Sequence, residues 1–182
     1  DDNPVIFMEH RWLYDVAGLV DEELSIPIGL SRVIRKGNAL TFVCTSWMNV
    51  EALKAAEILA RRGVEVEVVD VRTVAPLEEN LIVQSVQKTG HCIVADYDWV
   101  FCGFSAELAA MINYRCFGAI KKPVERLGYA HVPCPTTRPL ENLFYPSAIN
   151  LIRTAEKMLG LSETDLSQDE FFSYEKNFKG PF

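Results

Sequence analysis

The amino-acid sequence predicts an α/β domain whose sheet is mostly parallel, with an antiparallel strand at one side. The run Val64–Asp70 carries β-branched residues with a period of two, and Pro76 and two glutamates then open a helical pattern. Strand and helix patterns alternate through the chain, which is typical of parallel strands joined by right-handed crossovers. Two apolar runs, 32–35 and 40–45, are separated by Lys36-Gly37-Asn38, which predicts an antiparallel hairpin.

The other elements are expected in a simple order. Before the hairpin, Pro4–Met8 is expected to form a short strand, and residues 15–30 an extended connector. Ser46 is expected to cap a helix that ends at Gly63. After the Val64 strand we expect a helix over 78–88 closed by Gly90, and then a strand over 91–95 ending at Asp96–Trp99. A helix from Gly103 to about residue 117 and a strand over 124–129 should follow. An irregular loop over 132–139 and an amphipathic helix from Pro146 to Leu159 should come next.

Composition limits the classes of function. The chain has 182 residues and a net charge of −7, which argues against binding to nucleic acid, since such binding relies on Lys and Arg side chains. No apolar run approaches the roughly 20 residues that cross a bilayer, and no signal peptide is visible. The five cysteines are an odd number without a Cys-x-x-Cys pair, which favours buried, reduced thiols and a reducing compartment over disulfides or metal ligands.

The usual catalytic motifs are missing from the sequence. It contains no Gly-x-Ser-x-Gly elbow, no phosphate-binding loop and no dinucleotide-binding glycine fingerprint, and its three histidines have no partner at metal-ligand spacing. His91 is interpreted as structural. His10, beside Glu9, could titrate or orient a neighbouring group. Asp96 and Asp98 could form an acid–base pair, although a solvated turn is the favoured interpretation.

Polar residues at strand ends offer an anion or interface site. Arg72 and Thr73 follow one strand, and Gly103 and Ser105 begin a helix whose free backbone N–H groups can bind an anion. For Arg72 the favoured alternative is a salt bridge to Asp70 or to a partner domain. For Gly103 it is close packing of the helix on the sheet.

The last 22 residues differ in character from the rest. Residues 161–182 hold five acids against two lysines, together with several aromatic residues that end at Phe182. Aromatic residues on a polar tail suggest docking onto another surface, and simple disorder is the equal alternative.

Several short motifs follow one another between residues 4 and 160. They are Glu-His-x-x-Leu-Tyr at 9–14, Pro-x-Gly at 27–29, a basic turn ending at Gly37, Glu-Ala-Leu-x-Ala-Ala at 51–56, Asp-x-Arg-Thr-x-x-Pro-Leu at 70–77, Ser-Val-x-Lys-Thr-Gly at 85–90, Gly-Phe-x-Ala-Glu at 103–107, Val-Pro at 132–133, and Pro-Leu-Glu at 139–141 followed by Pro-Ser at 146–147. In this order they resemble the carboxyl-terminal, transketolase-like domain of the beta subunit of thiamine-diphosphate-dependent 2-oxo acid dehydrogenases, of the pyruvate and branched-chain type.

The resemblance implies a three-layer α/β/α fold over residues 31–160, preceded in 1–30 by the last strand of an upstream domain and a connector, and followed by an acidic and aromatic tail. It implies no catalytic, cofactor-binding or metal-binding residue in this chain. Thiamine diphosphate and Mg are expected only in the intact enzyme, which decarboxylates a 2-oxo acid and transfers the acyl group to a lipoyl arm.

The implied role is therefore that of a structural and subunit-interaction domain, inactive alone. Its expected partners are an alpha subunit, a second beta subunit and a lipoyl acyltransferase core, with Glu9, His10 and Phe182 as interface residues. The expected location is the cytoplasm, or the mitochondrial matrix in a eukaryote. The alternatives are a stand-alone α/β anion-binding or interaction module around Arg72, and the carboxyl-terminal domain of a transketolase-type enzyme.

Overall fold

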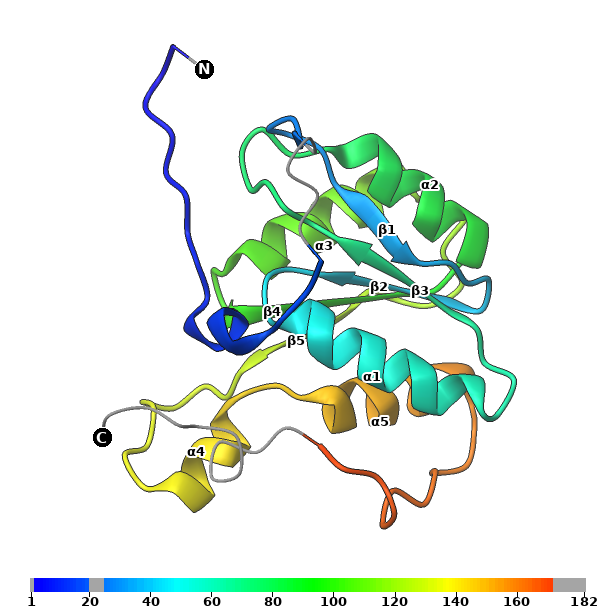
Figure 1. Cartoon of the computed structure of the whole chain (residues 1–182). Helices are drawn as coiled ribbons and strands as arrows, with labels where there is room; N and C mark the ends of the chain where they lie inside the picture. The colour runs from blue at the N-terminus through cyan, green and yellow to red at the C-terminus, as the bar shows by residue number, and fades with distance from the viewer. Residues whose placement is uncertain (1, 20–24, 172–182) are drawn as a thin grey trace.

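A five-stranded mixed sheet forms the middle layer of the molecule (Figure 1). The computed structural model describes residues 2–19 and 25–171. The strands are β1 (Arg32–Arg35), β2 (Leu40–Cys44), β3 (Val66–Asp70), β4 (Cys92–Trp99) and β5 (Glu125–Tyr129), in the spatial order β1-β3-β2-β4-β5. Strands β2 to β5 pair in parallel and β1 pairs antiparallel with β3, so the predicted mostly parallel sheet is confirmed.

The predicted hairpin between β1 and β2 is wrong, because β3 lies between these two strands. Asp70 of β3 is opposite Arg32 on one side and Cys44 on the other. The turn at 36–38 crosses the start of β3, where a Cβ atom on Gly37 would overlap the backbone of Val66 and its neighbours. The first four residues of β3 are buried, and such a strand is stabilised by a hydrogen-bonding neighbour on each side, which a β1–β2 hairpin would deny it.

Helices cover both faces of the sheet, which confirms the three-layer fold (Figure 1). Helices α1 (Met48–Ala60) and α5 (Ala148–Leu159) lie on one face, and α2 (Glu79–Thr89) and α3 (Phe104–Arg115) on the other. Alternate strand residues divide between the two cores: Phe42 and Val68 face α1 and α5, whereas Val43 and Val69 face α2 and α3.

The start of α1 differs from the expectation. Ser46 is not the N-cap: it has a positive φ of 48°, and Trp47 precedes the helix without a side-chain cap. The indole Nε1 of Trp47 instead donates a hydrogen bond to Glu51 Oε1 at 3.0 Å, one turn into the helix. Gly63, with φ of 75°, follows the helix as predicted.

Two segments are more regular than predicted. Strand β4 continues to Trp99, which pairs with Tyr129 of β5, so 96–99 is strand and not a turn. The loop expected over 132–139 leads into a short helix, α4 (Arg138–Phe144), with a proline in its first turn, where a missing N–H costs nothing.

The first described residues do not form the expected strand. Residues 4–8 have no regular structure, and the chain then makes a 3-10 helix, η1 (Arg11–Asp15). In Figure 1 the extended blue stretch before η1 runs away from the body of the domain. A strand needs a neighbour to accept and donate its backbone hydrogen bonds, and no described strand pairs with these residues.

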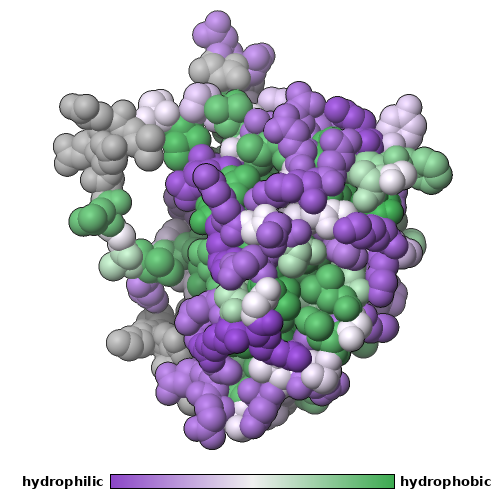
Figure 2. All heavy atoms as spheres, turned by 90° about the vertical axis from the view of Figure 1, so that its right-hand side faces the viewer, coloured by the Kyte–Doolittle hydropathy of each residue, from purple (hydrophilic) through white to green (hydrophobic). Residues whose placement is uncertain are grey.

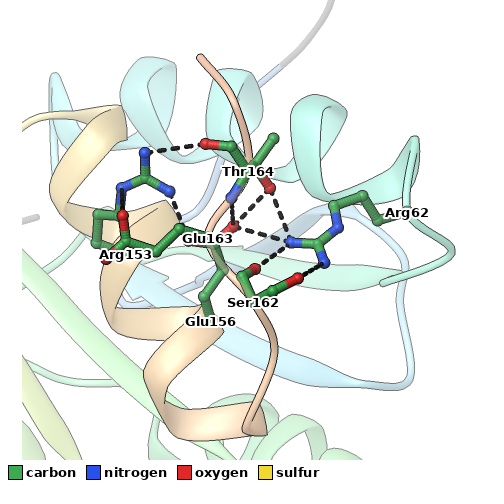
Figure 3. Close-up of polar contacts among 6 residues, drawn as sticks. All are labelled: Arg62, Arg153, Glu156, Ser162, Glu163 and Thr164. Atoms are coloured by element: carbon green, nitrogen blue, oxygen red, sulfur yellow. Dashed lines mark hydrogen bonds and ion pairs between the residues drawn. The ribbon is translucent and has the colours of Figure 1, made fainter.

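The first part of the tail docks on its own domain. Leu161, Leu166 and Phe171 pack against the hydrophobic core that α1 and α5 form with the sheet. The buried carboxylate of Glu156 on α5 fixes the same segment, because it accepts hydrogen bonds from the backbone and hydroxyl groups of Thr164 (Figure 3). Residues 172–182, including Phe182, lie outside the described part of the chain. No helix among the described residues is long and apolar enough to cross a membrane.

Candidate functional site

An aromatic cluster lies at the carboxyl ends of β4 and β5. It joins Trp12 of η1, Trp47 before α1, Tyr97 of β4, Tyr129 of β5 and Tyr145 after α4. Ring centroids are 5.4 Å apart for Trp12 and Trp47 and 5.9 Å for Tyr97 and Tyr129, mostly in edge-to-face contact. The cluster therefore fixes η1 and the α4–α5 connection to the edge where α/β domains bind ligands and partners.

His10 belongs to this cluster. Its Nδ1 accepts a hydrogen bond from Trp12 N at 3.3 Å, which places the ring proton on Nε2. The ring stacks on Trp47 at 6.1 Å and meets Tyr97 edge-on at 5.3 Å. Burial lowers the pKa of His10, so the imidazole is neutral at pH 7 and serves to seat η1 on the sheet.

Glu9 contacts a different residue from those around His10. Its Oε2 accepts a hydrogen bond from the exposed Tyr14 hydroxyl at 2.8 Å, and this bond raises the pKa of Tyr14. The two adjacent residues that the sequence singled out thus have different surroundings. The interface role predicted for both remains a prediction.

A pocket of about 210 Å³ opens beside the cluster, between η1, β4 and the α4–α5 connection. Its lining is Trp12, Glu51, Tyr97, Glu141, Asn142, Tyr145, Pro146, Ser147, Ile149 and Phe171. Glu51, only 4% exposed, accepts hydrogen bonds from Trp47 Nε1 at 3.0 Å and from Ala148 N, at the start of α5, at 2.8 Å. Burial raises its pKa against these two bonds.

Sequence reasoning missed the role of Glu51. The residue was noted only as part of a helix motif, although a tryptophan four positions earlier is a local signal for a side-chain contact on one helix face. Its second partner, the amide of Ala148, is 97 residues away and gives no local signal. The buried carboxylate joins the amino ends of α1 and α5 at the pocket.

Asp96 does not lie in a solvated turn, so that interpretation is wrong. The residue is in β4, and the Thr45 hydroxyl donates a hydrogen bond to its carboxylate. Burial raises the pKa of Asp96 in spite of this bond. Asp98 accepts from the backbone N of Trp99 at 2.7 Å. Both carboxylates therefore have structural partners, and no histidine or lysine is bonded to either in the described chain.

The salt bridge favoured for Arg72 is present. Arg72 Nε lies 3.3 Å from Asp70 Oδ2, and Asp70 also accepts from Asn49 at 2.7 Å. Thr73 Oγ1 accepts from Gly29 N at 3.0 Å. The Thr73 contact ties the connector before β1 to the end of β3, and the Asp70 carboxylate lies against Nε of Arg72.

Gly103 is required for close packing, the interpretation that the sequence favoured. A Cβ atom there would overlap the Trp99 carbonyl and come within 2.9 Å of an Asp98 carboxylate oxygen. Ser105, on the same helix end, is buried. Arg72 and Thr73 follow β3, whereas Gly103 and Ser105 come after β4. Because β2 lies between β3 and β4, these two pairs of residues are not at the ends of neighbouring strands. The anion site stays a prediction.

The cysteines are five free thiols, of which Cys44, Cys92 and Cys116 are buried and Cys102 and Cys134 exposed. The described ranges contain no group of three or more His, Cys, Asp or Glu side chains that could hold a metal ion.

The fold places the protein in a class of α/β domains with solved members. A solved structure described as a split gene transketolase, an inactive beta4 tetramer, superposes with a TM-score of 0.66 and 24% identity, over 81% of this chain and 48% of that one. A family model, the transketolase C-terminal domain, matches residues 29–151. The chain belongs to the transketolase C-terminal domain family.

Curated relatives agree with the subfamily that the motifs indicated. The beta subunit of acetoin:2,6-dichlorophenolindophenol oxidoreductase from Cupriavidus necator is 36% identical over 160 residues, 87% of this chain and 47% of the relative. The pyruvate dehydrogenase E1 component subunit beta of Rickettsia bellii is 37% identical over 159 residues, 87% of this chain and 49% of the relative. The mitochondrial pyruvate dehydrogenase beta subunit of Dictyostelium discoideum is 33% identical, over 87% of this chain and 46% of its own length. The chain spans about half the length of the curated relatives it matches.

Proposed function

We propose that this chain is the subunit-interaction domain of the beta subunit of a thiamine-diphosphate-dependent 2-oxo acid dehydrogenase. The single observation that carries the proposal is the 37% identity to the pyruvate dehydrogenase E1 component subunit beta of Rickettsia bellii over 87% of the chain. The intact enzyme would oxidatively decarboxylate a 2-oxo acid and pass the acyl group to a lipoyl group. This chain would supply packing surfaces and no reacting group.

The amino-terminal segment supports a role in assembly. Ile6, Phe7 and Met8 are 87%, 82% and 78% exposed, and consecutive apolar residues are typical of a strand buried on both faces. The segment leads directly into η1, which the aromatic cluster holds on the domain. We propose that this segment is buried as a strand against an upstream domain of the beta subunit.

The partners follow from the same proposal. They are an alpha subunit, a second beta subunit and the lipoyl acyltransferase core, and thiamine diphosphate with Mg would be bound elsewhere in the assembly. The enzyme would work in the bacterial cytoplasm or in the mitochondrial matrix. One relative is named for acetoin and others for pyruvate, so both compounds are substrates to test.

A reconstitution experiment tests the proposal. The purified chain is titrated with thiamine diphosphate and Mg by calorimetry, and we expect no saturable heat. It is then co-expressed with the remaining part of the Cupriavidus necator relative's beta subunit and that relative's alpha subunit, and cleavage of pyruvate and of acetoin is measured. We expect turnover only from the assembled set.

A surface variant makes the test specific. Phe7→Asp should prevent assembly, because it places a charge in the buried strand, whereas Val132→Asp, at a residue 50% exposed elsewhere on the domain, should not. Saturable binding of thiamine diphosphate by the isolated chain, or turnover by it alone, would contradict the proposal.

A further inference from the structure

We propose that the pocket beside the aromatic cluster binds a small organic cation that carries a methylated ammonium group. The proposed function assigns no ligand to this pocket, and the inference does not depend on that function. It rests on the charge of the pocket, on its aromatic wall and on its size.

The charged side chains that line the pocket are both acidic. Glu51 and Glu141 belong to its lining, which includes no lysine, arginine or histidine. Glu141 is half-buried in the first turn of α4 and makes no ion pair with any other described residue. A carboxylate without a partner at the wall of a pocket attracts a positively charged ligand.

The same arrangement disfavours an anion. Helix α5 begins at the pocket, where its free N–H groups would attract a negative charge. The carboxylate of Glu51 already takes that place, because its Oε2 accepts from Ala148 N at 2.8 Å. Its Oε1 accepts from Trp47 Nε1 at 3.0 Å. A further anion would therefore meet two carboxylates instead of a free helix end.

Aromatic rings form one wall of the pocket. Trp12, Tyr97 and Tyr145 contact one another, with ring centroids 5.8, 5.7 and 5.7 Å apart. Phe171, from the first part of the tail, also belongs to the lining. Ring faces carry partial negative charge, and several rings around one site recognise methylated ammonium groups. Such a group has no N–H to donate, which suits a pocket whose buried carboxylate oxygens already accept hydrogen bonds.

The volume of the pocket limits the ligand to a small molecule. It is about 210 Å³, whereas pockets for drug-sized ligands measure about 300–1,000 Å³. A second cavity, of about 140 Å³, is different in kind, because Lys122 and Lys157 line it together with Glu125 and no aromatic residue does. The acidic and aromatic pocket is therefore the better site for a cation.

The pocket lies at η1 and α4, on the left of the molecule in Figure 1. Figure 2 shows the side that faces right in Figure 1, where hydrophilic side chains surround smaller groups of hydrophobic ones. That side has the mixed character of an ordinary solvated surface. The proposed site is thus separate from it.

The test is a calorimetric titration of the full chain with choline and with dimethylbutanol, the neutral carbon isostere of choline. We expect saturable binding of choline that is at least about 10-fold tighter than binding of the isostere, because only the cation gains from the carboxylates and the ring faces. Tryptophan fluorescence should change in the same titration, since Trp12 is part of the wall. Sodium chloride at the same concentration controls for ionic strength.

Two pairs of variants locate the binding. Glu141→Gln should weaken choline binding about 10-fold, whereas Glu107→Gln, an equal change of net charge in the first turn of α3, should not. Tyr145→Phe should retain binding and Tyr145→Leu should weaken it, because only phenylalanine keeps a ring face. Circular dichroism checks that each variant is folded, and the glutamine pair decides the outcome if Tyr145→Leu unfolds.

Several results would overturn the inference. They are a wild-type chain that does not bind choline, equal affinities for choline and its isostere, and equal effects of the two glutamine variants. Equal affinities of folded Tyr145→Phe and Tyr145→Leu would overturn it as well, because the ring face would then contribute nothing. These titrations use neither thiamine diphosphate nor another subunit, so the inference can fail while the proposed function stands.

Discussion

The carboxylate of Glu156 provides the sharpest test of how the domain is held together (Figure 3). The side chain is 2% exposed and accepts from Thr164 N at 2.7 Å, Thr164 Oγ1 at 2.5 Å and Arg62 at 3.1 Å on one oxygen. Its other oxygen accepts from Arg153 at 2.8 Å. Glu156→Gln keeps an acceptor at the first position but removes the charge and turns an NH₂ group towards Arg153.

The expected loss of unfolding free energy is about 2 kcal/mol. A hydrogen bond to a charged group contributes about 1.5–3 kcal/mol. The lower part of that range applies because the side chains of Arg62 and Arg153 are 29% and 34% exposed, and water replaces part of what they lose. For a chain of this length, 2 kcal/mol corresponds to a decrease in Tm of about 4–8 °C.

The assay is urea unfolding followed by tryptophan fluorescence at one fixed protein concentration, with Glu163→Gln as the matched control. Glu163 is 81% exposed and 3.9 Å from Arg153, so its replacement should cost about 0.5 kcal/mol or less. Hydrogen exchange at the Thr164 amide should also become faster in Glu156→Gln and not in the control.

The pH dependence supplies a second criterion. Burial acts to raise the pKa of Glu156, but hydrogen bonds from Thr164 and Arg153 outweigh it and hold the pKa below the usual 4.5. A depressed pKa in the folded state gives stability that is present above pH 4.5 and is lost as the pH falls through the folded pKa. The difference between wild type and Glu156→Gln should therefore shrink in acid. Equal losses for the two glutamine variants, or a difference that does not change with pH, would refute this reasoning.

Three further predictions concern thiols, glycines and a histidine. Cys102 and Cys134 should react with a thiol reagent in the native protein, and all five thiols only after unfolding, because burial keeps the reagent from the other three. A third thiol that reacts as fast as these two in the native protein would contradict this. Gly103→Ala should destabilise the fold by about 1–3 kcal/mol through overlap with the Trp99 carbonyl, whereas Gly18→Ala, with nothing within 4 Å, should not; equal melting curves would argue against it. His10 should titrate below pH 6.5 by NMR, and its contribution to stability should be full above pH 6.5 and lost as the pH falls through the folded pKa; a midpoint above 6.5 would exclude the buried ring.

Local patterns predicted most elements of this fold. The Val64 strand, the helix closed by Gly90 and the amphipathic helix from Pro146 to Leu159 follow from period and breakers within a few residues. The helix Arg138–Phe144 was missed because Pro139 lies in its first turn, where a proline is tolerated, and not in its interior, where it would end a helix. The strand at 4–8 was predicted from apolar content and from the resemblance, neither of which provides a neighbouring strand among the described residues.

The candidate site was predicted less completely than the fold. His10 was identified from its place beside Glu9, and the Arg72 salt bridge was the favoured interpretation. The pocket was not predicted, because Trp12, Tyr97 and Phe171 lie far apart in the sequence and meet only in the folded chain. A buried glutamate such as Glu51 looks like any helix glutamate until its distant partner is known.

The sequence by itself determined the succession of most strands and helices along the chain, the α/β class and the family, because these depend on short motifs and on periodicity within single segments. The tertiary structure alone decided that β3 lies between β1 and β2, that Asp96 is inside the sheet, and that Glu156 fastens the tail. Strand neighbours and buried charges are chosen by hydrogen bonds and packing between residues distant in the chain. No local pattern encodes those partners, so only the folded molecule shows them.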